Sequence, residues 1–364
     1  MTKPPDRPLR LLVVCPSWVG DVVMATPVLR LLRDQLPGAF IGGLVRPGCD
    51  LVLAGAGFFD ELHIERPSGV LGPKFVAAKI RPRRYDTALL LTNSFSTALI
   101  TRIAGVPRRF GYDRDGRGFL LTNKIKASKR PGGRRVIVPA VESYWRIATH
   151  MLAQFSLYEH AQDKPPSGIY LELATTEEDE SKASEILNAA DVGNRQFVVL
   201  NPGGNNPAKR WPTERFAKLA DELASTHVVL INGSPAEQEL VDEIIAHAHS
   251  DPVSLAALGN TLGSLKSIVQ RAALMVTNDT GPRHLAVAFG TPVVSLFGPT
   301  DHRWTAVPTR PGGDEVILLA DPDLPETESA NDNPERCRID RIGYEVVRDA
   351  AIGLLGGSTA DEKA

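Results

Sequence analysis

The sequence has little cysteine and no long apolar run. Its three cysteines, Cys15, Cys49 and Cys337, are too few and too widely spaced for a disulfide framework, which favours a reducing compartment. No apolar stretch approaches the roughly 18 residues of a membrane-spanning helix, and Leu11–Cys15 is too short for the core of a signal peptide. We therefore expect a cytoplasmic protein. Its 364 residues favour two domains, because a single core stops growing near about 250–300 residues.

The common cofactor and metal motifs are also missing. No G-x-G-x-x-G follows a predicted strand, and there is no G-x-x-x-x-G-K-[ST] phosphate loop. Neither H-E-x-x-H, C-x-x-C nor G-x-S-x-G occurs, and the eight histidines are scattered. The sequence therefore predicts no bound cofactor and no metal ion.

Charge is unevenly divided along the chain, although the net charge is only −2. Residues 1–170 carry 25 Lys and Arg against 13 Asp and Glu, whereas residues 171–364 carry 16 against 30. The basic half suits a phosphorylated acceptor, an anionic membrane or a nucleic acid, unless its charges only face solvent. The basic stretch of Lys124-Ile125-Lys126 and residues 129–135 lacks interleaved aromatics, which favours an acceptor- or membrane-facing loop over nucleic-acid binding.

Short apolar runs alternate with amphipathic segments. The runs resemble strands buried on both faces, which are typical of parallel sheets; they are Leu11–Cys15, Ala88–Leu91, Phe197–Leu200, Val228–Ile231, Leu274–Val276 and Val293–Phe297. Helices are predicted over Thr213–Ala224, Ala236–Ala248, Leu262–Ala273 and Tyr344–Leu355. The pattern predicts an α/β protein with parallel sheets.

Composition along the chain predicts domain boundaries. We expect a first domain over residues 1–175 and a second over residues 176–340, with a linker near residues 163–195 and a long loop over Pro308–Asn333. Residues 341–364 are predicted to form a helix that packs back toward the first domain, followed by a frayed tail.

Three polar segments each follow a predicted strand, where ligands bind in parallel sheets. In the first, Pro16–Asp21, the Asp21 carboxylate either stabilises the start of a helix predicted over Val22–Leu32 or acts as a general base on an acceptor hydroxyl.

The second segment is Asn201–Pro212. It could bind a diphosphate through Lys209 and Arg210, beside the start of a helix, or it could be a polar loop with incidental charges. The backbone N–H groups that could bind the anion belong to Gly203, Gly204 and Asn205.

The third segment is Thr277–His284. Asp279 is expected to cap the following helix, and it could also orient Lys209 or a substrate hydroxyl. The N–H groups of Thr280 and Gly281 would point at a phosphate. His284 is equally well interpreted as a buried structural side chain or as a functional one.

Together these segments resemble the ADP-heptose lipopolysaccharide heptosyltransferases of glycosyltransferase family 9, most closely the heptosyltransferase II branch. The resemblance covers roughly residues 10–305, in order. Its motifs are Pro16–Asp21, Tyr85-Asp86 with Thr92–Phe95, Ala104–Gly111, Pro207–Pro212, Asn278–Gly281 and Phe297–Thr300.

The resemblance implies a GT-B fold, in which two Rossmann-like domains with parallel sheets face a central cleft. It also implies inverting, metal-independent transfer of heptose from ADP-heptose to an inner-core lipopolysaccharide sugar, with peripheral contact to the anionic inner membrane. By position, Asp21 corresponds to the general base and Lys209 to the lysine on the donor diphosphate. The implied donor-binding residues are Asp279, Thr280 and Gly281 for the phosphates and Glu237 for the ribose. The implied acceptor-binding residues are Trp18, Asn93 and Ser94.

Two positions and two segments depart from the branch. The segments are the Pro308–Asn333 loop and Pro334–Cys337. Ser96 stands where a lysine is common, and Arg283 where a methionine is common. Another nucleotide-sugar and a different glycan acceptor therefore stay open as an alternative. A binding protein without catalysis is disfavoured, because both Asp21 and Lys209 are present.

Overall fold

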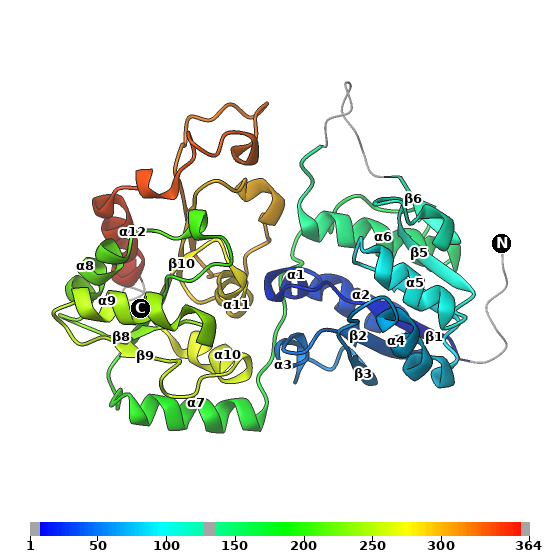
Figure 1. Cartoon of the computed structure of the whole chain (residues 1–364), viewed down its shortest axis with the longest axis horizontal. Coiled ribbons are helices and arrows are strands. Elements are labelled where there is room, and N and C mark those ends of the chain that lie inside the picture. Colours follow the sequence, from blue (N-terminus) through cyan, green and yellow to red (C-terminus); the bar gives the residue numbers. More distant parts are fainter. Residues whose placement is uncertain (1–7, 127–135, 358–364) are drawn as a thin grey trace. The chain divides into compact units, whose positions relative to one another are not determined.

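The computed structural model describes residues 8–126 and 136–357, and Figure 1 shows its two α/β units. One unit comprises Met1–Glu172 with Arg303–Val307, and the other comprises Leu173–His302 with Pro308–Ala364. The predictions made for residues 129–135 and for the tail beyond residue 357 lie outside the described residues.

The first unit contains a six-stranded parallel sheet in the order β3-β2-β1-β4-β5-β6. Its strands are β1 (Arg10–Val14), β2 (Phe40–Val45), β3 (Glu61–Ile64), β4 (Thr87–Leu90), β5 (Arg108–Tyr112) and β6 (Asn123–Ile125). Its α-helices are α1 (Val19–Met24), α2 (Thr26–Gln35), α3 (Cys49–Leu53), α4 (Gly72–Ile80), α5 (Phe95–Ile103) and α6 (Ala140–Gln154).

The second unit repeats this plan with the order β12-β11-β10-β7-β8-β9, again parallel throughout. Its strands are β7 (Phe197–Asn201), β8 (Val228–Ile231), β9 (Val253–Ser254), β10 (Leu274–Asn278), β11 (Val293–Phe297) and β12 (Glu315–Leu319). Its α-helices are α7 (Glu177–Ala189), α8 (Thr213–Leu223), α9 (Gln238–His247), α10 (Leu262–Arg271), α11 (Gly281–Phe289) and α12 (Tyr344–Gly357). Each sheet has the strand order of a dinucleotide-binding fold, which confirms the predicted α/β class.

The helix expected over Val22–Leu32 is instead two helices, α1 and α2, that meet at Ala25. Pro27 lacks the N–H that would donate to the carbonyl of Val23, and the Thr26 hydroxyl donates to that carbonyl instead, at 2.7 Å. Asp21 consequently lies inside the short helix α1 rather than before a long one.

Two segments expected to be irregular contain regular structure. The acidic run inside the predicted linker forms the first turn of α7, where Thr176 and Asp179 make a capping box and carboxylates complement the helix dipole. The predicted loop Pro308–Asn333 contains β12, whose backbone pairs with β11. In both places polar composition concealed an element that pairing or capping stabilises.

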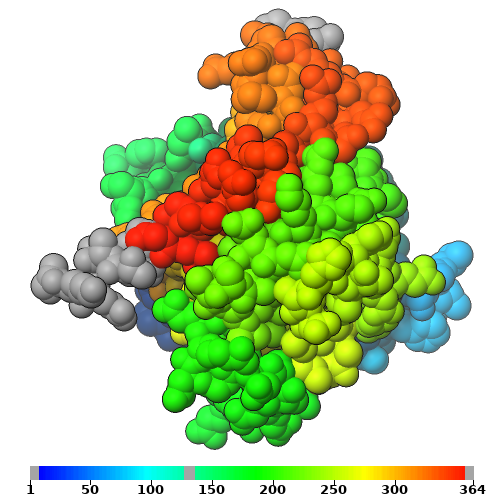
Figure 2. Space-filling model, turned by 90° about the vertical axis from the view of Figure 1, so that its left-hand side faces the viewer, coloured from blue at the N-terminus to red at the C-terminus, as the bar shows by residue number. Residues whose placement is uncertain are grey.

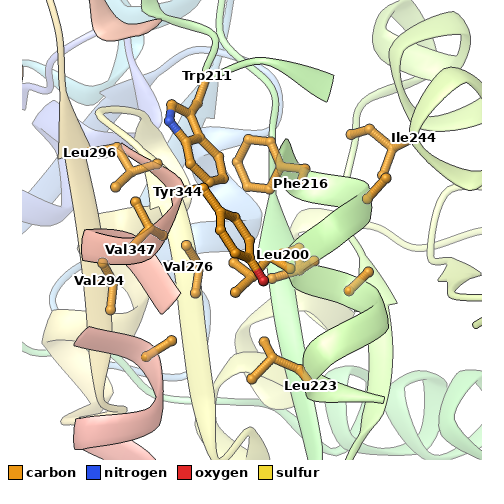
Figure 3. Packing of buried hydrophobic residues seen from close by; sticks show 14 of the residues in the cluster. Leu200, Trp211, Phe216, Leu223, Ile244, Val276, Val294, Leu296, Tyr344 and Val347 are labelled. Carbon is orange, nitrogen blue, oxygen red and sulfur yellow. The ribbon is translucent and has the colours of Figure 1, made fainter. Parts of the chain in front are cut away.

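The last helix, α12, packs on the second sheet. Tyr344, Val347 and Ala351 are buried in one cluster with Trp211 and residues of β7, β8, β10 and β11 (Figure 3). The space-filling view shows this red helix lying against the green atoms of α8 (Figure 2). The sequence predicted packing toward the first domain; in the structure the apolar face of α12 covers the core of the second unit.

Candidate functional site

The polar segments of the second unit meet at one edge of its sheet. Strands β7 and β10 are neighbours, and Asn201 is the register partner of Thr277, so the loops that follow both strands begin side by side. The amide of Asn201 donates to the hydroxyls of Thr277 and Thr280, each at 2.9 Å. This contact joins the residue before α11 to the last residue of β7.

Hydrogen bonds between asparagine side chains continue along this edge of the sheet. The amide of Asn232, after β8, donates to Asn201 Oδ1 at 2.7 Å, and that of Asn260 donates to Asn232 Oδ1 at 3.2 Å. Asn278, at the end of β10, donates to the carbonyls of Pro202 and Gly203. Sequence analysis did not single out these side chains for bracing, although the position of three of them at or just after strand ends is the available signal.

Lys209 and Asp279 form an ion pair at this edge, with Nζ 2.8 Å from Oδ2. The Thr300 hydroxyl donates to the same oxygen at 2.9 Å. Burial alone would raise the pKa of Asp279, but the Lys209 ammonium outweighs it and lowers that pKa. Asp279 thus contacts Lys209, one of the two partners that the sequence suggested for it, whereas the helix cap is Thr280 rather than Asp279.

Glu237 lies beside the loop after β7. One of its carboxylate oxygens accepts the Gly204 N–H at 2.7 Å, and the other accepts the N–H and hydroxyl of Ser234. These bonds outweigh burial and lower the pKa of Glu237. The Gly204 N–H therefore donates to the Glu237 carboxylate, whereas the sequence suggested that it would bind a diphosphate.

Behind the ion pair lies a buried cluster on α11. The guanidinium of Arg283 pairs with Glu315 of β12, with Nε 2.6 Å from the carboxylate. His284 is also buried, and its Nδ1 has no hydrogen-bond partner among the described residues. Burial, reinforced by Arg283, lowers the pKa of His284 to about 3, so its imidazole is neutral near pH 7.

In the first unit, Asp21 lies half-buried in α1, after the carboxyl end of β1. The hydroxyl of Tyr144, on α6, donates to Asp21 Oδ1 at 3.4 Å. Burial and the Asp21 charge raise the pKa of Tyr144 well above 10, so the phenol stays a donor. Tyr144 is not marked as a site residue in the sequence, because no local pattern identifies a side chain whose partner lies 123 residues away.

The expected acceptor residues follow two neighbouring strands of the first sheet. Trp18 comes after β1 and is exposed, whereas Asn93 and Ser94 come after β4. The buried guanidinium of Arg117 donates to Asn93 Oδ1 at 3.2 Å and to the Ser94 carbonyl. Arg117 thereby holds the 93–94 loop from behind, another role that sequence analysis did not find.

Comparison with known proteins identifies the family. The family model described as glycosyltransferase family 9 (heptosyltransferase) matches residues 75–335. Lipooligosaccharide heptosyltransferase 2 of Haemophilus influenzae is 30% identical over 310 residues, covering 82% of this chain and 85% of that protein. Lipopolysaccharide heptosyltransferase 2 of Escherichia coli is 29% identical over 307 residues, with the same coverage.

Solved structures agree with the fold. The structure of E. coli ADP-heptose lipopolysaccharide heptosyltransferase II matches with a TM-score of 0.78 and 26% identity, covering 97% of this chain and all of that one. An E. coli heptosyltransferase with ADP-2-deoxy-2-fluoro heptose matches with a TM-score of 0.64 at 18% identity. The predicted GT-B fold of two Rossmann-like units is confirmed.

Across residues 8–126 and 136–357, no helix has both the length and the apolarity to cross a bilayer.

Proposed function

The chain belongs to glycosyltransferase family 9, and we propose that it transfers heptose from ADP-heptose to an inner-core sugar of lipopolysaccharide, with inversion at the anomeric carbon. The observation that carries this proposal is the Lys209–Asp279 ion pair beside the start of α11. It holds a cation next to a helix N-terminus, and that combination binds a diphosphate.

The departure of ADP depends on this positive potential. Lys209, together with the N–H groups of Thr280 and Gly281 at the start of α11, would stabilise the negative charge that develops on the leaving diphosphate. Because protein groups supply this charge, we expect transfer to proceed without a metal ion.

The remaining donor contacts are assigned to the loop after β7. Gly203, Gly204 and Asn205 would border the nucleotide, with Glu237 accepting a hydroxyl of the ribose. A carboxylate has about four acceptor positions, and Glu237 uses three in the contacts described above. One position therefore stays available for the ribose.

Asp21 is assigned the role of general base. It would take the proton of an acceptor hydroxyl as that oxygen forms its bond to the anomeric carbon. The bond from that carbon to the diphosphate oxygen breaks at the same time, and ADP leaves with the electron pair. A carboxylate in this role contributes about 10²–10⁴ in rate.

The acceptor is assigned to the first unit, near Trp18, Asn93 and Ser94. The excess of Lys and Arg over residues 1–170 supports a phosphorylated acceptor and peripheral contact with the anionic inner membrane.

Calorimetry with ADP-heptose, ADP, UDP and GDP, in the presence of a chelator, tests the donor. Selective binding of ADP and ADP-heptose is expected. A preference for UDP or GDP would favour the alternative, a family 9 enzyme that uses another nucleotide-sugar and a different glycan acceptor.

A further inference from the structure

Three apolar side chains are exposed together at the start of α4. Val70, Leu71 and Phe75 are 96%, 58% and 64% exposed. The Phe75 N–H donates to the Leu71 carbonyl, one helical turn earlier, so these two side chains lie on one face, with Val70 next to them. Single exposed apolar side chains are ordinary on a protein surface, but a contiguous group indicates an interaction site.

This exposure is not explained by a need to pack α4 on its own unit. The opposite face of the helix already does so, through Val76, Ala77 and Ile80, which are buried in the first core. Helix α4 lies beside α5 in the same unit (Figure 1). The exposed side of α4 carries Phe75, and Val70 and Leu71 come just before the helix; the described residues leave these three side chains uncovered.

Basic residues are concentrated in and beside α4. Residues 66–84 contain six Lys and Arg and no Asp or Glu. All six are exposed; they are Arg66, Lys74, Lys79, Arg81, Arg83 and Arg84. Two of them pair with carboxylates that lie just before this stretch, Lys79 with Glu65 and Arg83 with Glu61. Lys74 directly precedes Phe75, and Lys79 follows it by one helical turn, so cations flank the apolar tip.

We propose that residues 69–79 form a membrane-docking surface, in which Val70, Leu71 and Phe75 enter the headgroup region of an anionic bilayer. Lys74 and Lys79 would lie at the level of the lipid phosphates. Apolar side chains that insert beside cations are the usual chemistry of interfacial helices, and each cation near an anionic surface adds about 1 kcal/mol.

Other partners fit this surface less well. A single-stranded nucleic acid would require several stacking rings, and the apolar tip has one aromatic side chain, Phe75. A stable protein interface buries about 800 Å² on each partner, and lysine is depleted from its core. Three exposed apolar side chains beside lysines match neither a nucleic-acid surface nor a stable protein interface.

The inference deepens the proposed membrane contact and rests on it, but it does not depend on the roles of Asp21 or Lys209. The bilayer is where a lipid-linked acceptor would lie. Docking through α4 would hold the first unit, to which the acceptor is assigned, at that surface.

Sedimentation of the full chain with lipid vesicles tests the surface. Wild type is expected to bind vesicles of phosphatidylethanolamine with phosphatidylglycerol, to bind pure phosphatidylcholine weakly, and to be released by salt. The triple variant Val70→Ser, Leu71→Ser, Phe75→Ser should lose at least about tenfold in vesicle affinity. Its fold should survive, because all three side chains are exposed, and an unchanged melting temperature would show this.

The matched control is Val346→Ser with Ile352→Ser, two exposed apolar side chains of α12 in the other unit, which should leave vesicle binding unchanged. Equal binding by wild type and the triple variant would overturn the proposal. A dimeric wild type together with a monomeric triple variant would also overturn it, since the exposed face would then be a protein interface. ADP binding is measured on the same samples. Its absence from wild type would contradict the proposed function and leave the vesicle result intact.

Discussion

Tyr144 donates its hydroxyl to Oδ1 of Asp21 across 3.4 Å, from a helix that begins 119 residues after Asp21 in the chain. The contact gives the carboxylate a fixed neighbour on one oxygen. Tyr144 is a positioning residue in this account, because it acts through Asp21 rather than on substrate.

Tyr144→Phe should lower kcat by about tenfold, since a hydrogen bond to a charged group contributes about 1.5–3 kcal/mol and this one is long. KM for the donor should stay unchanged, because Asp21 acts on the acceptor. Steady-state kinetics with varied donor separates the two parameters. A rise in donor KM with an unaltered kcat would contradict the positioning role.

Asp21→Asn should lower kcat by about 10²–10⁴, because the amide cannot accept the acceptor proton. Binding of ADP, measured by calorimetry, should remain. Asp50→Asn is the matched control, since Asp50 is also a first-turn carboxylate in a short helix of the same unit, and it should keep full activity. An active Asp21→Asn enzyme would remove Asp21 from the mechanism.

Lys209→Met should weaken both ADP binding and turnover, and it should also change acid stability. The lowered folded pKa of Asp279 contributes stability that is present above the unfolded value and is lost as pH falls through the folded value. The melting temperature of wild type should therefore exceed that of the variant at neutral pH, and the difference between the two should shrink in acid. Lys182→Met, at an exposed ion pair, is the control for a lost surface charge. A gap that stays constant with pH would contradict the coupling.

Gly203→Ala should weaken ADP binding more than Gly204→Ala does. A Cβ at Gly203 would stand 2.4 Å from a carboxylate oxygen of Glu237, so the loop or the glutamate must move. A Cβ at Gly204 would meet nothing closer than 3.6 Å. Calorimetry on the two variants compares them directly, and equal affinities would show that the contact between Glu237 and the loop is unimportant for the donor.

His284 should make the protein sensitive to acid. Its folded pKa is about 3, so below about pH 6.5 the unfolded chain binds a proton that the folded chain does not, and stability falls by about 1.4 kcal/mol per pH unit. Denaturant unfolding at a series of pH values between 7 and 4 gives the free energy of unfolding, which should fall less steeply with pH in His284→Gln than in wild type. The control His160→Gln, at an exposed histidine, should keep the wild-type slope. If wild type and both variants lost stability equally with falling pH, the His284 imidazole would not contribute to the acid sensitivity.

The apolar runs were a sound guide to the fold, because a strand buried on both faces must be apolar throughout. Val228–Ile231 and Val293–Phe297 match β8 and β11 residue for residue. Mixed composition concealed other elements. Strand β12 lies at the sheet edge, where none of its residues is fully buried, inside a segment rich in Pro, Gly, Asp and Glu. The acidic start of α7 resembled a linker until its capping box was seen.

Polar residues after strand ends were equally informative at the site, and for the same reason. Neighbouring parallel strands deliver their following loops to one edge, so Lys209 and Asp279 could be expected to meet before any contact was known. The sequence did not indicate which partner each polar group binds. The Gly204 N–H, for example, donates to Glu237.

The sequence by itself determined the α/β class, the central strands and the residues that follow them, because burial and turn chemistry are encoded in neighbouring positions. Only the tertiary structure decided that Tyr144 meets Asp21, that Arg117 holds Asn93, and that α12 covers the second core. These contacts join residues far apart in the chain. They depend on which faces pack together, and no local pattern of side chains carries that information.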